Sequence, residues 1–417
     1  MLEKDFAQQV IDAGGRLYIV GGWVRDRLMG KVPHDKDFVV VGLSKEKFVT
    51  VFTDAKLIGK SFPVFLMEID GVKCEVAFAR KEHKAGKGYK GFDVEYCDIS
   101  IEEDLFRRDT TVNSIAMDVA TGNIIDPYGG QQDIKAMLLR PVSEHFGEDP
   151  VRALRAARQA AQMDFSVSED LLAAMRQCRE EIVDEPAERV FSELKKVLET
   201  KKPSIFFQLL RKAGLLEVLF PEINALIGKT QPVDFHPEGD AYNHTMEIID
   251  RIADGTTNVV PVFAGLVHDI GKGTTPMDML PHHYDHEKRG LEVMDRWNKR
   301  MRLPKVWVQA AKMVISHHMR APLMRKPGKI TELVLFLHDM EKYLAPKDFC
   351  RIIMADHGSL PVYLEKYDDL LQKLLRINGT MAPAEKKGTE IGEWLLQKRT
   401  AACVAWLANN SNGENFC

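Results

Sequence analysis

Residues 16–41, RLYIVGGWVRDRLMGKVPHDKDFVVV, decide the fold of the first part of the chain. An apolar run at 16–20 ends in Gly21-Gly22 and is followed by WVRD, which predicts a strand, a tight turn and the start of a helix. A second apolar run at 38–41 follows the acidic segment HDKD and predicts a neighbouring strand. The stretch therefore predicts a sheet with charged groups where its strands begin and end.

The rest of the chain divides into a β-rich and a helical part. Short β-rich runs continue to about residue 125, whereas beyond Pro141 patterns such as VRALRAARQAAQM place apolar residues at helical spacing. The 417 residues provide enough chain for two to four domains. We expect an α+β protein with an α/β head at 1–139, a helical neck and body at 140–235, an all-α domain at 236–360 and a helical tail at 361–417.

Composition excludes several classes of protein. The 57 Lys and Arg stand against 61 Asp and Glu, a net charge of -4, so any nucleic-acid surface must be local. The six cysteines form no Cys-x-x-Cys pair and are interpreted as buried or incidental thiols in a reducing cytosol. No apolar run approaches the length of about 18 residues that predicts a membrane span. We expect a cytoplasmic protein that does not bind membranes.

Three carboxylates are candidates for a catalytic metal site. Asp35 and Asp37 are two residues apart at the start of a predicted strand, on one side of it. Paired carboxylates at a strand edge suit Mg²⁺ ions that bridge a triphosphate and an attacking hydroxyl. Glu75 in KCEVAFAR is the best-placed third carboxylate. The alternatives are a solvated turn for the aspartates and an edge-strand position facing water for Glu75.

Two further stretches suit a bound polyphosphate. Gly22 lets the backbone approach phosphate oxygens, and Arg25 can add a bidentate contact. Arg108 and Asp109 lie in RRDTTVNS, where an arginine can hold triphosphate oxygens. An ordinary Gly-Gly turn with a surface arginine, and a salt-bridged helix start, explain these stretches as well.

The segment EDPVRALR predicts a capped helix that presents polar groups. Asp149 followed by proline has the form of an N-cap with proline at the first helical position. Arg152 and Arg155 are then three residues apart on one helix face. An Asp and an Arg on a rigid helix can offer an acceptor and donors to the edge of a base. The alternative is a capped helix with solvated arginines.

Taken together and in this order, these strings resemble the class II tRNA nucleotidyltransferases, the CCA-adding enzymes of the DNA polymerase beta superfamily. The matching strings are GGWVRD, HDKD, RRDTTVNS, DPYGG and EDPVRALR. The resemblance implies a polymerase-beta-like nucleotidyltransferase head in which Asp35 and Asp37 hold the catalytic Mg²⁺ ions. It implies that CTP and ATP are bound and selected by residues that correspond to Gly22, Arg25, Arg108, Asp109, Asp149, Arg152 and Arg155.

The chain departs from the family pattern at one position and keeps a loop that the family uses. Thr110 stands where the family usually has Phe or Leu after RRD, a change that keeps the polar contacts. The Gly- and Lys-rich stretch 82–96 falls where the family has a flexible loop that helps the site switch from C to A. The resemblance therefore favours full CCA addition over addition of CC alone.

A second group of polar residues predicts a metal site in the later part of the chain. His268-Asp269 lies in the apolar stretch FAGLVHDIGKG, which we expect to be a helix, with His244 upstream and Asp356 downstream. A second dipeptide, His338-Asp339, lacks the Gly-Lys that follows the first. Further histidines that could contribute are His282, His283, His286, His317 and His318.

The first dipeptide and its partners resemble the HD phosphohydrolase superfamily. The resemblance implies that His244, His268, Asp269 and Asp356 hold a divalent metal, for which Ni²⁺, Mn²⁺ and Mg²⁺ are the candidates. In longer CCA-adding enzymes such a domain has phosphatase, 2′-nucleotidase and 2′,3′-cyclic phosphodiesterase activity. The alternative is an inactive remnant kept for packing.

One segment carries a local excess of positive charge. Residues 287–329 hold 12 Lys or Arg against 3 Asp or Glu, and include Trp297 and Trp307. Such a segment can hold RNA phosphates, although a solvated helix face explains a run of charge equally well.

The resemblances together predict addition of C, C and A to the 3′ end of tRNA from CTP and ATP, with release of pyrophosphate. The nearest alternative is a bacterial poly(A) polymerase, which usually has a basic pair where this chain has Lys60 and Ser61. A hydrolase with a degenerate head and a tRNA-binding chaperone without chemistry are further alternatives. No protein partner is implied, and we expect a monomer or a homodimer.

Overall fold

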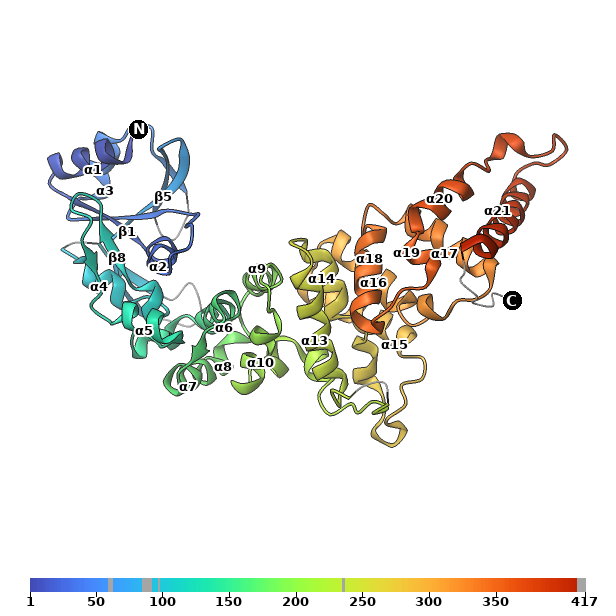
Figure 1. Cartoon of the computed structure of the whole chain (residues 1–417). Coiled ribbons are helices and arrows are strands. Elements are labelled where there is room, and N and C mark those ends of the chain that lie inside the picture. Colours follow the sequence, from blue (N-terminus) through green and yellow to red (C-terminus); the bar gives the residue numbers. More distant parts are fainter. Residues whose placement is uncertain (59–62, 85–91, 97, 235–236, 411–417) are drawn as a thin grey trace. The chain divides into compact units, whose positions relative to one another are not determined.

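The computed structural model describes residues 1–58, 63–84, 92–96, 98–234 and 237–410. The chain folds into two compact units (Figure 1). The first unit combines Met1–Glu193 with Ile205–Leu219, and the second combines Leu194–Ser204 with Phe220–Cys417. The finer division at 139, 235 and 360 stays a prediction.

The first unit is built on a mixed sheet with the strand order β3-β4-β5-β2-β1-β8-β9. Strand β1 runs antiparallel to both β2 and β8, whereas the central strand β2 runs parallel to β5. These strands confirm the β-rich runs predicted before residue 125. Their bounds are β1 Arg16–Val20, β2 Asp37–Val41, β3 Lys56–Ile58, β4 Val64–Ile69, β5 Val72–Phe78, β8 Ala116–Asp118 and β9 Ile124–Ile125.

Alternating side chains along the strands separate two apolar layers. On one face α1 (Glu3–Asp12) and α3 (Lys45–Val51) cover the sheet, and their Phe6 and Phe48 pack with Phe38 of β2. On the other face Tyr18 and Val39 pack with residues of α4 (Ile101–Phe106). Because strand side chains alternate, Asp37 and Val39 lie on this second face. The carboxylate of Asp37 therefore lies on the face of the sheet that α4 covers.

Short helices and two small sheets complete the first unit. The pairs β6–β7 (Lys81–Lys84 and Phe92–Glu95) and β10–β11 (Leu138–Leu139 and Ser166–Val167) lie outside the main sheet. Part of the expected flexible loop, residues 85–91, lies outside the described residues, as do Lys60 and Ser61. The other helices that lie wholly or mostly in this unit are α2 Gly22–Leu28, α5 Gly130–Ala136, α6 Val151–Met163, α7 Glu169–Gln177, α8 Arg179–Ile182, α9 Ala187–Val197, α10 Ser204–Lys212 and α11 Leu216–Leu219.

The second unit is helical throughout its described residues, as the sequence predicts. Its core contains Phe263, whose ring packs against Trp297 and Trp307. Both tryptophans of the basic segment are therefore core residues that cannot stack on RNA bases. The helices are α12 Pro221–Asn224, α13 Ala241–Asp254, α14 Val259–Leu266, α15 His286–Met301, α16 Lys305–His317, α17 Pro327–Asp339, α18 Pro346–His357, α19 Val362–Glu365, α20 Tyr367–Leu375 and α21 Thr389–Asn410.

Two expectations about composition can be compared with the described part of the chain. None of its helices combines the length and the apolar character needed to cross a membrane. Its cysteines are free thiols, buried at Cys74, Cys178 and Cys403 and partly buried at Cys350, as expected for thiols without a metal or disulfide role. Cys97 and Cys417 lie outside the described residues.

Candidate functional site

The turn after β1 is the strand–turn–helix that the sequence predicts. Val20 ends the strand, Gly21 has φ +72, and α2 begins at Gly22. A side chain at Gly21 would be strained at this positive φ, and its Cβ would lie 3.4 Å from Nη1 of Arg108. The glycine turn and Arg108, which are far apart in sequence, therefore form one wall of the same site.

The carboxylates predicted to bind metal converge on the α4 side of the sheet. Asp37 is directly opposite Glu75 in the parallel register of β2 and β5. Asp35 precedes β2, whose first residue is Asp37, so of the two aspartates only Asp37 is a strand residue. Glu75 lies on an internal strand and not at an edge, although its side chain is exposed as the alternative expected.

The electrostatics of these carboxylates suit a cation. Desolvation, followed by the negative charges of Glu75 and Asp35, raises the pKa of Asp37 to about 6, against the opposing charges of Arg108 and Arg155. Like charges this close resist simultaneous ionisation unless a cation offsets them. Oxygen donors clustered in this way are the ligands that Mg²⁺ takes in proteins. The residues therefore fit a divalent cation, and the identity of that ion stays a prediction.

Arg108 is positioned by a buried aspartate. Its Nη2 donates to Oδ2 of Asp104 over 3.0 Å, and Arg107 donates to Oδ1 of the same residue over 2.7 Å. Burial opposes ionisation of Asp104, but the two guanidinium groups outweigh it and hold its pKa at about 2. Nε of Arg108 is buried and has no hydrogen-bond partner among the described residues. This guanidinium thus keeps a donor for a ligand.

Arg25 is held more tightly than a surface arginine. It is 5% exposed, and its Nη1 donates to Oδ1 of Asn113 over 2.7 Å. Its Nε donates to Asp26 over 2.8 Å. The surface-arginine alternative is therefore wrong, and Arg25 links the start of α2 to the RRD segment.

Asp109 joins the RRD segment to α6. Its Oδ2 accepts from Nε of Arg155 over 2.8 Å and from Nε2 of Gln159 over 2.9 Å. Thr110 donates its backbone N–H to Oδ1 and its hydroxyl to Gln159. Burial opposes ionisation, yet Arg155 and the N–H of Thr110 hold the pKa of Asp109 well below its ordinary value. Thr110 therefore supports the polar network, as expected for this departure from the family.

Asp149 lies one residue before the N-cap of α6, which is the position that the sequence predicts for it. Helix α6 begins at Val151 with Pro150 as its N-cap, so Asp149 is not the cap residue that the sequence predicts. Its carboxylate still accepts from the N–H of Val151 over 3.1 Å and is held by Arg189 at 2.9 Å. Arg152 is 7% exposed and donates to the carbonyl of His145, which excludes a solvated arginine at that position.

The sequence analysis missed several residues that orient this first site. Asp104 and Arg189 each bind a predicted site residue, but nothing in their local sequence marks them, whereas Asn113, which binds Arg25, lies within the RRDTTVNS string. Gln159 is different, because it lies four residues after Arg155 on α6 and so on the same helix face. Helical spacing alone could have identified Gln159.

The predicted metal ligands of the second unit lie on separate elements that meet. His244 lies on α13 and Asp356 on α18. Helix α14 ends at Leu266, so His268 and Asp269 lie in the turn after it, and the expectation that they are helical is wrong. The turn is tight because Gly271 packs against α15, where an added Cβ would clash with the carbonyl of His286.

These four side chains form one buried cluster. Nε2 of His244 lies 3.0 Å from Oδ1 of Asp356 and 3.9 Å from Oδ2 of Asp269. Nε2 of His268 lies 3.2 Å from Oδ2 of Asp269 and 3.8 Å from Oδ1 of Asp356. The structure therefore brings together the whole predicted set, whereas His338 pairs weakly with Glu341 at 3.9 Å on a different helix.

The orientation of the histidine rings in the cluster suits a divalent metal. Nδ1 of His268 donates to the carbonyl of Gly265 over 2.7 Å, and Nδ1 of His244 faces Oε1 of Glu238 at 2.6 Å. Nε2 of each ring therefore faces carboxylate oxygens with which it can share a cation. Burial opposes protonation of His268, but Asp269 and Asp356 outweigh it and raise its pKa to about 9.

Further side chains contact Asp269. Among them are His286 and His318, which the sequence analysis names only as histidines that could contribute. Nε2 of His286 and Nε2 of His318 each lie 3.3 Å from Oδ1 of Asp269. Lys272 contacts Oδ2 at 2.6 Å. His268, Asp269 and His318 form a second group whose ligand atoms are close enough to share an ion. A cavity of about 600 Å³ opens onto Asp269, His286 and Asp356.

Most basic side chains of segment 287–329 are exposed, which fits both an RNA-binding segment and a solvated helix face. Most of its cations are exposed on α15, α16 and the segment that follows, as at Lys299, Arg302 and Lys305. A role in RNA binding stays a prediction.

Family models match three consecutive parts of the chain. The model described as "Poly A polymerase head domain" matches residues 17–140, and the one described as "Probable RNA and SrmB- binding site of polymerase A" matches residues 164–227. The model described as "HD domain" matches residues 242–355. The head and its carboxylates define a nucleotidyltransferase, to which an HD domain is joined.

Curated relatives extend this assignment to most of the chain. A multifunctional CCA protein of Acinetobacter baylyi is 38% identical over 93% of this chain and 96% of its own length. One of Methylobacillus flagellatus is 39% identical over 94% of this chain and 97% of its own length. The chain belongs to the family of multifunctional CCA proteins, and it is an enzyme of the nucleotidyltransferase class.

A solved structure agrees with the fold. The CCA-adding enzyme of Bacillus stearothermophilus in complex with CTP has a TM-score of 0.65 and 23% identity, covering 98% of this chain and 93% of that chain. At this identity the likeness concerns the fold alone.

Proposed function

We propose that this enzyme adds C, C and A to the 3′ end of tRNA from CTP and ATP, and restores that end where it is incomplete, in the cytoplasm. One observation carries the proposal: Asp37 and Glu75 are opposite each other, beside Asp35, on the sheet face that Arg108 approaches. This arrangement supports a site that combines metal-binding oxygens with a phosphate-binding cation. The family name of the curated relatives supports the choice of CCA addition over poly(A) synthesis.

The chain's own residues divide the work of the reaction. Asp35, Asp37 and Glu75 would hold Mg²⁺ ions, while Gly22, Arg25 and Arg108 would bind the triphosphate. Such ions lower the pKa of an attacking hydroxyl and offset charge on the departing pyrophosphate. The free Nε of Arg108 is the donor placed to bind phosphate oxygens as this charge develops.

Nucleotide selection would rest on α6. Asp149 and Arg152 carry an acceptor and donors, and both are held by contacts outside the base site. Arg155 is tied to Asp109 and would position the nucleotide rather than bind the base freely. Since rigid polar groups discriminate donors from acceptors on a base edge, this arrangement suits a choice between cytosine and adenine.

The test is extension of a tRNA that lacks its terminal CCA, resolved on a gel with Mg²⁺ and CTP, ATP or both. We expect growth by two nucleotides with CTP and by one more when ATP is added. A long ladder of A would instead identify a poly(A) polymerase, and no extension would refute the proposal for the head.

We also propose that the HD domain is an active hydrolase of phosphate esters: 2′,3′-cyclic phosphates, 2′-phosphates and phosphomonoesters. The observation that supports activity over an inactive remnant is the complete, buried set of His and Asp ligands. His268 and His244 would orient a divalent metal through rings fixed by their Nδ1 contacts. The metal would supply Lewis acidity and an activated water.

Hydrolysis of 2′,3′-cyclic AMP, 2′-AMP and p-nitrophenyl phosphate with Ni²⁺, Mn²⁺ or Mg²⁺ tests this second activity. We expect turnover with at least one metal and loss of turnover after chelation. If none of the three substrates is hydrolysed with any of the three metals, the HD domain is an inactive remnant.

A further inference from the structure

A buried glutamine of the second unit has an amide nitrogen that the described residues leave without a partner. Gln231 is 3% exposed and lines the cavity of about 600 Å³ that opens onto the His and Asp cluster. Its Oε1 accepts from Nζ of Lys272 over 2.5 Å, whereas its Nε2 has no hydrogen-bond partner among the described residues. Because an unpaired buried donor costs free energy, this amide indicates a ligand that enters the cavity.

The orientation of this amide is fixed by its partner. An ammonium group donates hydrogen bonds and accepts none, so the end of the amide that faces Lys272 must be its carbonyl oxygen. The amide nitrogen is then the end that remains for a ligand. Lys272 has three N–H donors, and besides Gln231 it contacts Oδ2 of Asp269 at 2.6 Å. The two side chains therefore keep N–H donors beyond those that their own contacts use.

The backbone around Gln231 is held against the turn that follows the first His-Asp dipeptide. Nζ of Lys229 donates to the carbonyl of Thr275 over 2.6 Å. His283 bridges the same two segments, because its Nδ1 lies 2.9 Å from Oγ1 of Thr275 and its Nε2 lies 3.0 Å from the carbonyl of Thr230. The amide is therefore already in place before a ligand binds, and binding does not have to order it.

The chemistry of these donors favours an anion. N–H donors bind oxygens that carry lone pairs, and the oxygens of a phosphate ester carry negative charge as well, which strengthens such hydrogen bonds. Lys272 joins Gln231 to Asp269, so the donors adjoin the His and Asp cluster. A phosphate ester held at that cluster therefore has donors beside it for the oxygens that do not react.

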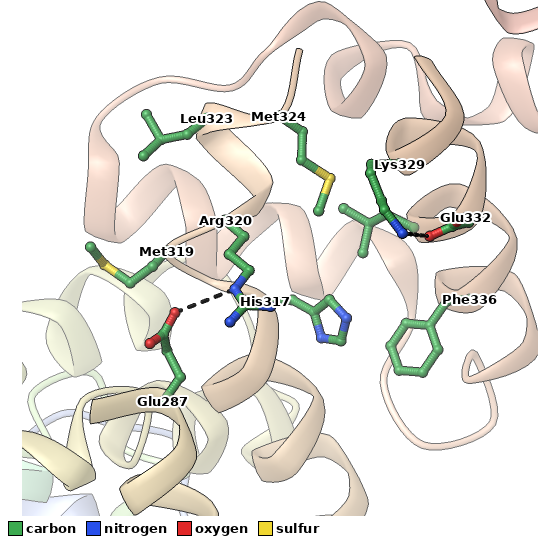
Figure 2. A pocket seen from close by; sticks show the side chains of 10 residues that line it. Glu287, His317, Met319, Arg320, Leu323, Met324, Lys329, Glu332 and Phe336 are labelled. Carbon is green, nitrogen blue, oxygen red and sulfur yellow. Dashed lines mark hydrogen bonds and ion pairs between the residues drawn. The ribbon is translucent and has the colours of Figure 1, made fainter. Parts of the chain in front are cut away.

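An adjoining cavity of about 790 Å³, which shares part of its wall with the first, differs in its polar groups. Figure 2 shows that its two cations each face a carboxylate. Arg320 lies 3.6 Å from Glu287, and Lys329 lies 2.6 Å from Glu332. The charged groups of this cavity thus have one another as partners. The unpartnered amide of Gln231 assigns the anion to the first cavity instead.

We propose that Gln231 is a substrate-binding residue of the HD domain, whose Nε2 donates to a phosphate oxygen that does not react while its Oε1 orients Lys272 towards the same anion. The inference rests on the proposed hydrolase activity and adds to it a residue outside the His and Asp ligand set. In this role Gln231 neither binds the metal nor transfers a proton. Its loss therefore raises KM more than it lowers kcat.

Kinetics of the full chain with Gln231→Glu separate the two ends of the amide. The variant keeps an acceptor for Lys272 but replaces the donor by a carboxylate oxygen, which repels an anion. KM for 2′,3′-cyclic AMP should rise roughly tenfold or more, the loss expected for a hydrogen bond to a charged group. Gln231→Met removes both polar ends at similar volume and should raise KM as well. Gln397→Glu adds the same charge on exposed α21, outside the cavity, and should leave KM unchanged.

Metal content distinguishes substrate binding from support of the metal cluster. Elemental analysis after gel filtration should find as much bound metal in Gln231→Glu and Gln231→Met as in the wild-type enzyme. Loss of metal from both variants would assign Gln231 to the support of the cluster and overturn its role in binding substrate.

Binding of inorganic phosphate tests the site without turnover. Calorimetric titration of the full chain loaded with Mn²⁺ should give roughly tenfold weaker binding for Gln231→Glu than for the wild type or Gln397→Glu. Wild-type KM and wild-type phosphate affinity in Gln231→Glu would overturn the role of Gln231 and leave the hydrolase intact. Weaker phosphate binding in that variant of an enzyme that hydrolyses no ester with any metal would support the anion site and refute the hydrolase.

Discussion

Arg189 of α9 donates through Nη2 to both carboxylate oxygens of Asp149, over 3.1 and 2.9 Å. Its Nη1 donates at the same time to Glu185 over 2.6 Å. The guanidinium therefore holds the Asp149 carboxylate in one orientation from a position 40 residues further along the chain. If Asp149 selects the base, Arg189 is the residue that positions the selecting group.

Replacing Arg189 by Ala should impair base selection more than folding. Released from its partner, the Asp149 carboxylate can rotate, and a misplaced group in a site of this kind costs roughly 10- to 100-fold in kcat/KM. Single-nucleotide incorporation kinetics should show a lower preference for CTP over ATP at the first added position.

Arg179→Ala is the matched control, because Arg179 also pairs with a glutamate in the same unit but contacts Gly214 and Glu217 instead of Asp149. It should keep the preference of the wild-type enzyme. An Arg189→Ala enzyme with wild-type preference would show that Asp149 needs no support.

Asp35→Ala and Asp37→Ala should each abolish CTP incorporation. Loss of one metal ligand removes several kcal/mol of transition-state stabilisation, or roughly a hundredfold or more in rate. Asp12→Ala removes a carboxylate that binds Gln8 on α1, and should extend tRNA normally. Retention of normal incorporation by Asp35→Ala would exclude a metal site at these aspartates.

Asp104→Asn should lower the stability of the head in a pH-dependent way. The folded pKa of about 2 lies below the ordinary value of 3.8, so the stabilisation by ionised Asp104 is complete above about pH 5 and disappears as pH falls towards 2. At pH 7 the substitution should cost about 1–3 kcal/mol, because it weakens hydrogen bonds from two guanidinium groups.

Hydrogen exchange in peptides that contain residues 101–113 measures this difference locally. The difference in the free energy of local opening between wild type and Asp104→Asn should be constant from pH 6 to 8. This difference should become smaller on acidification below about pH 4. A free-energy difference that does not depend on pH would mean that packing, and not the charge of Asp104, stabilises this part of the head.

The two His-Asp dipeptides allow an internal comparison of the HD site. His268→Ala should abolish metal-dependent hydrolysis and reduce metal retention at least roughly tenfold, because it removes a ligand from a buried set. His338→Ala changes the same residue type in the other dipeptide, at the exposed end of α17. It should retain both activity and metal content, measured by elemental analysis after gel filtration. Equal loss in both variants would argue against the cluster as the metal site.

The local sequence predicts the strands and the turn of the head, because these elements depend on residues that are neighbours in the chain. The alternation of RLYIV, the positive φ that Gly21 permits and the apolar opening of β2 are properties of neighbouring residues. By contrast, the spacing in FAGLVHDIGKG predicts a helix through His268, and packing ends that helix at Leu266 because Gly271 must approach α15 closely. The wrong prediction has a long-range cause.

The sequence by itself determined the strand–turn–helix at Gly21, the carboxylates at 35 and 37, and His244, His268, Asp269 and Asp356 as a ligand set. Only the tertiary structure decided that Glu75 lies opposite Asp37, that Arg189 holds Asp149, and that His286 and His318 join Asp269. The turn at Gly21 follows from the backbone preferences of neighbouring residues, and the ligand sets follow from the resemblance of their motifs to known families. The contacts that the tertiary structure decided depend on strand register and helix packing, where residues tens of positions apart meet because each must bury its apolar face.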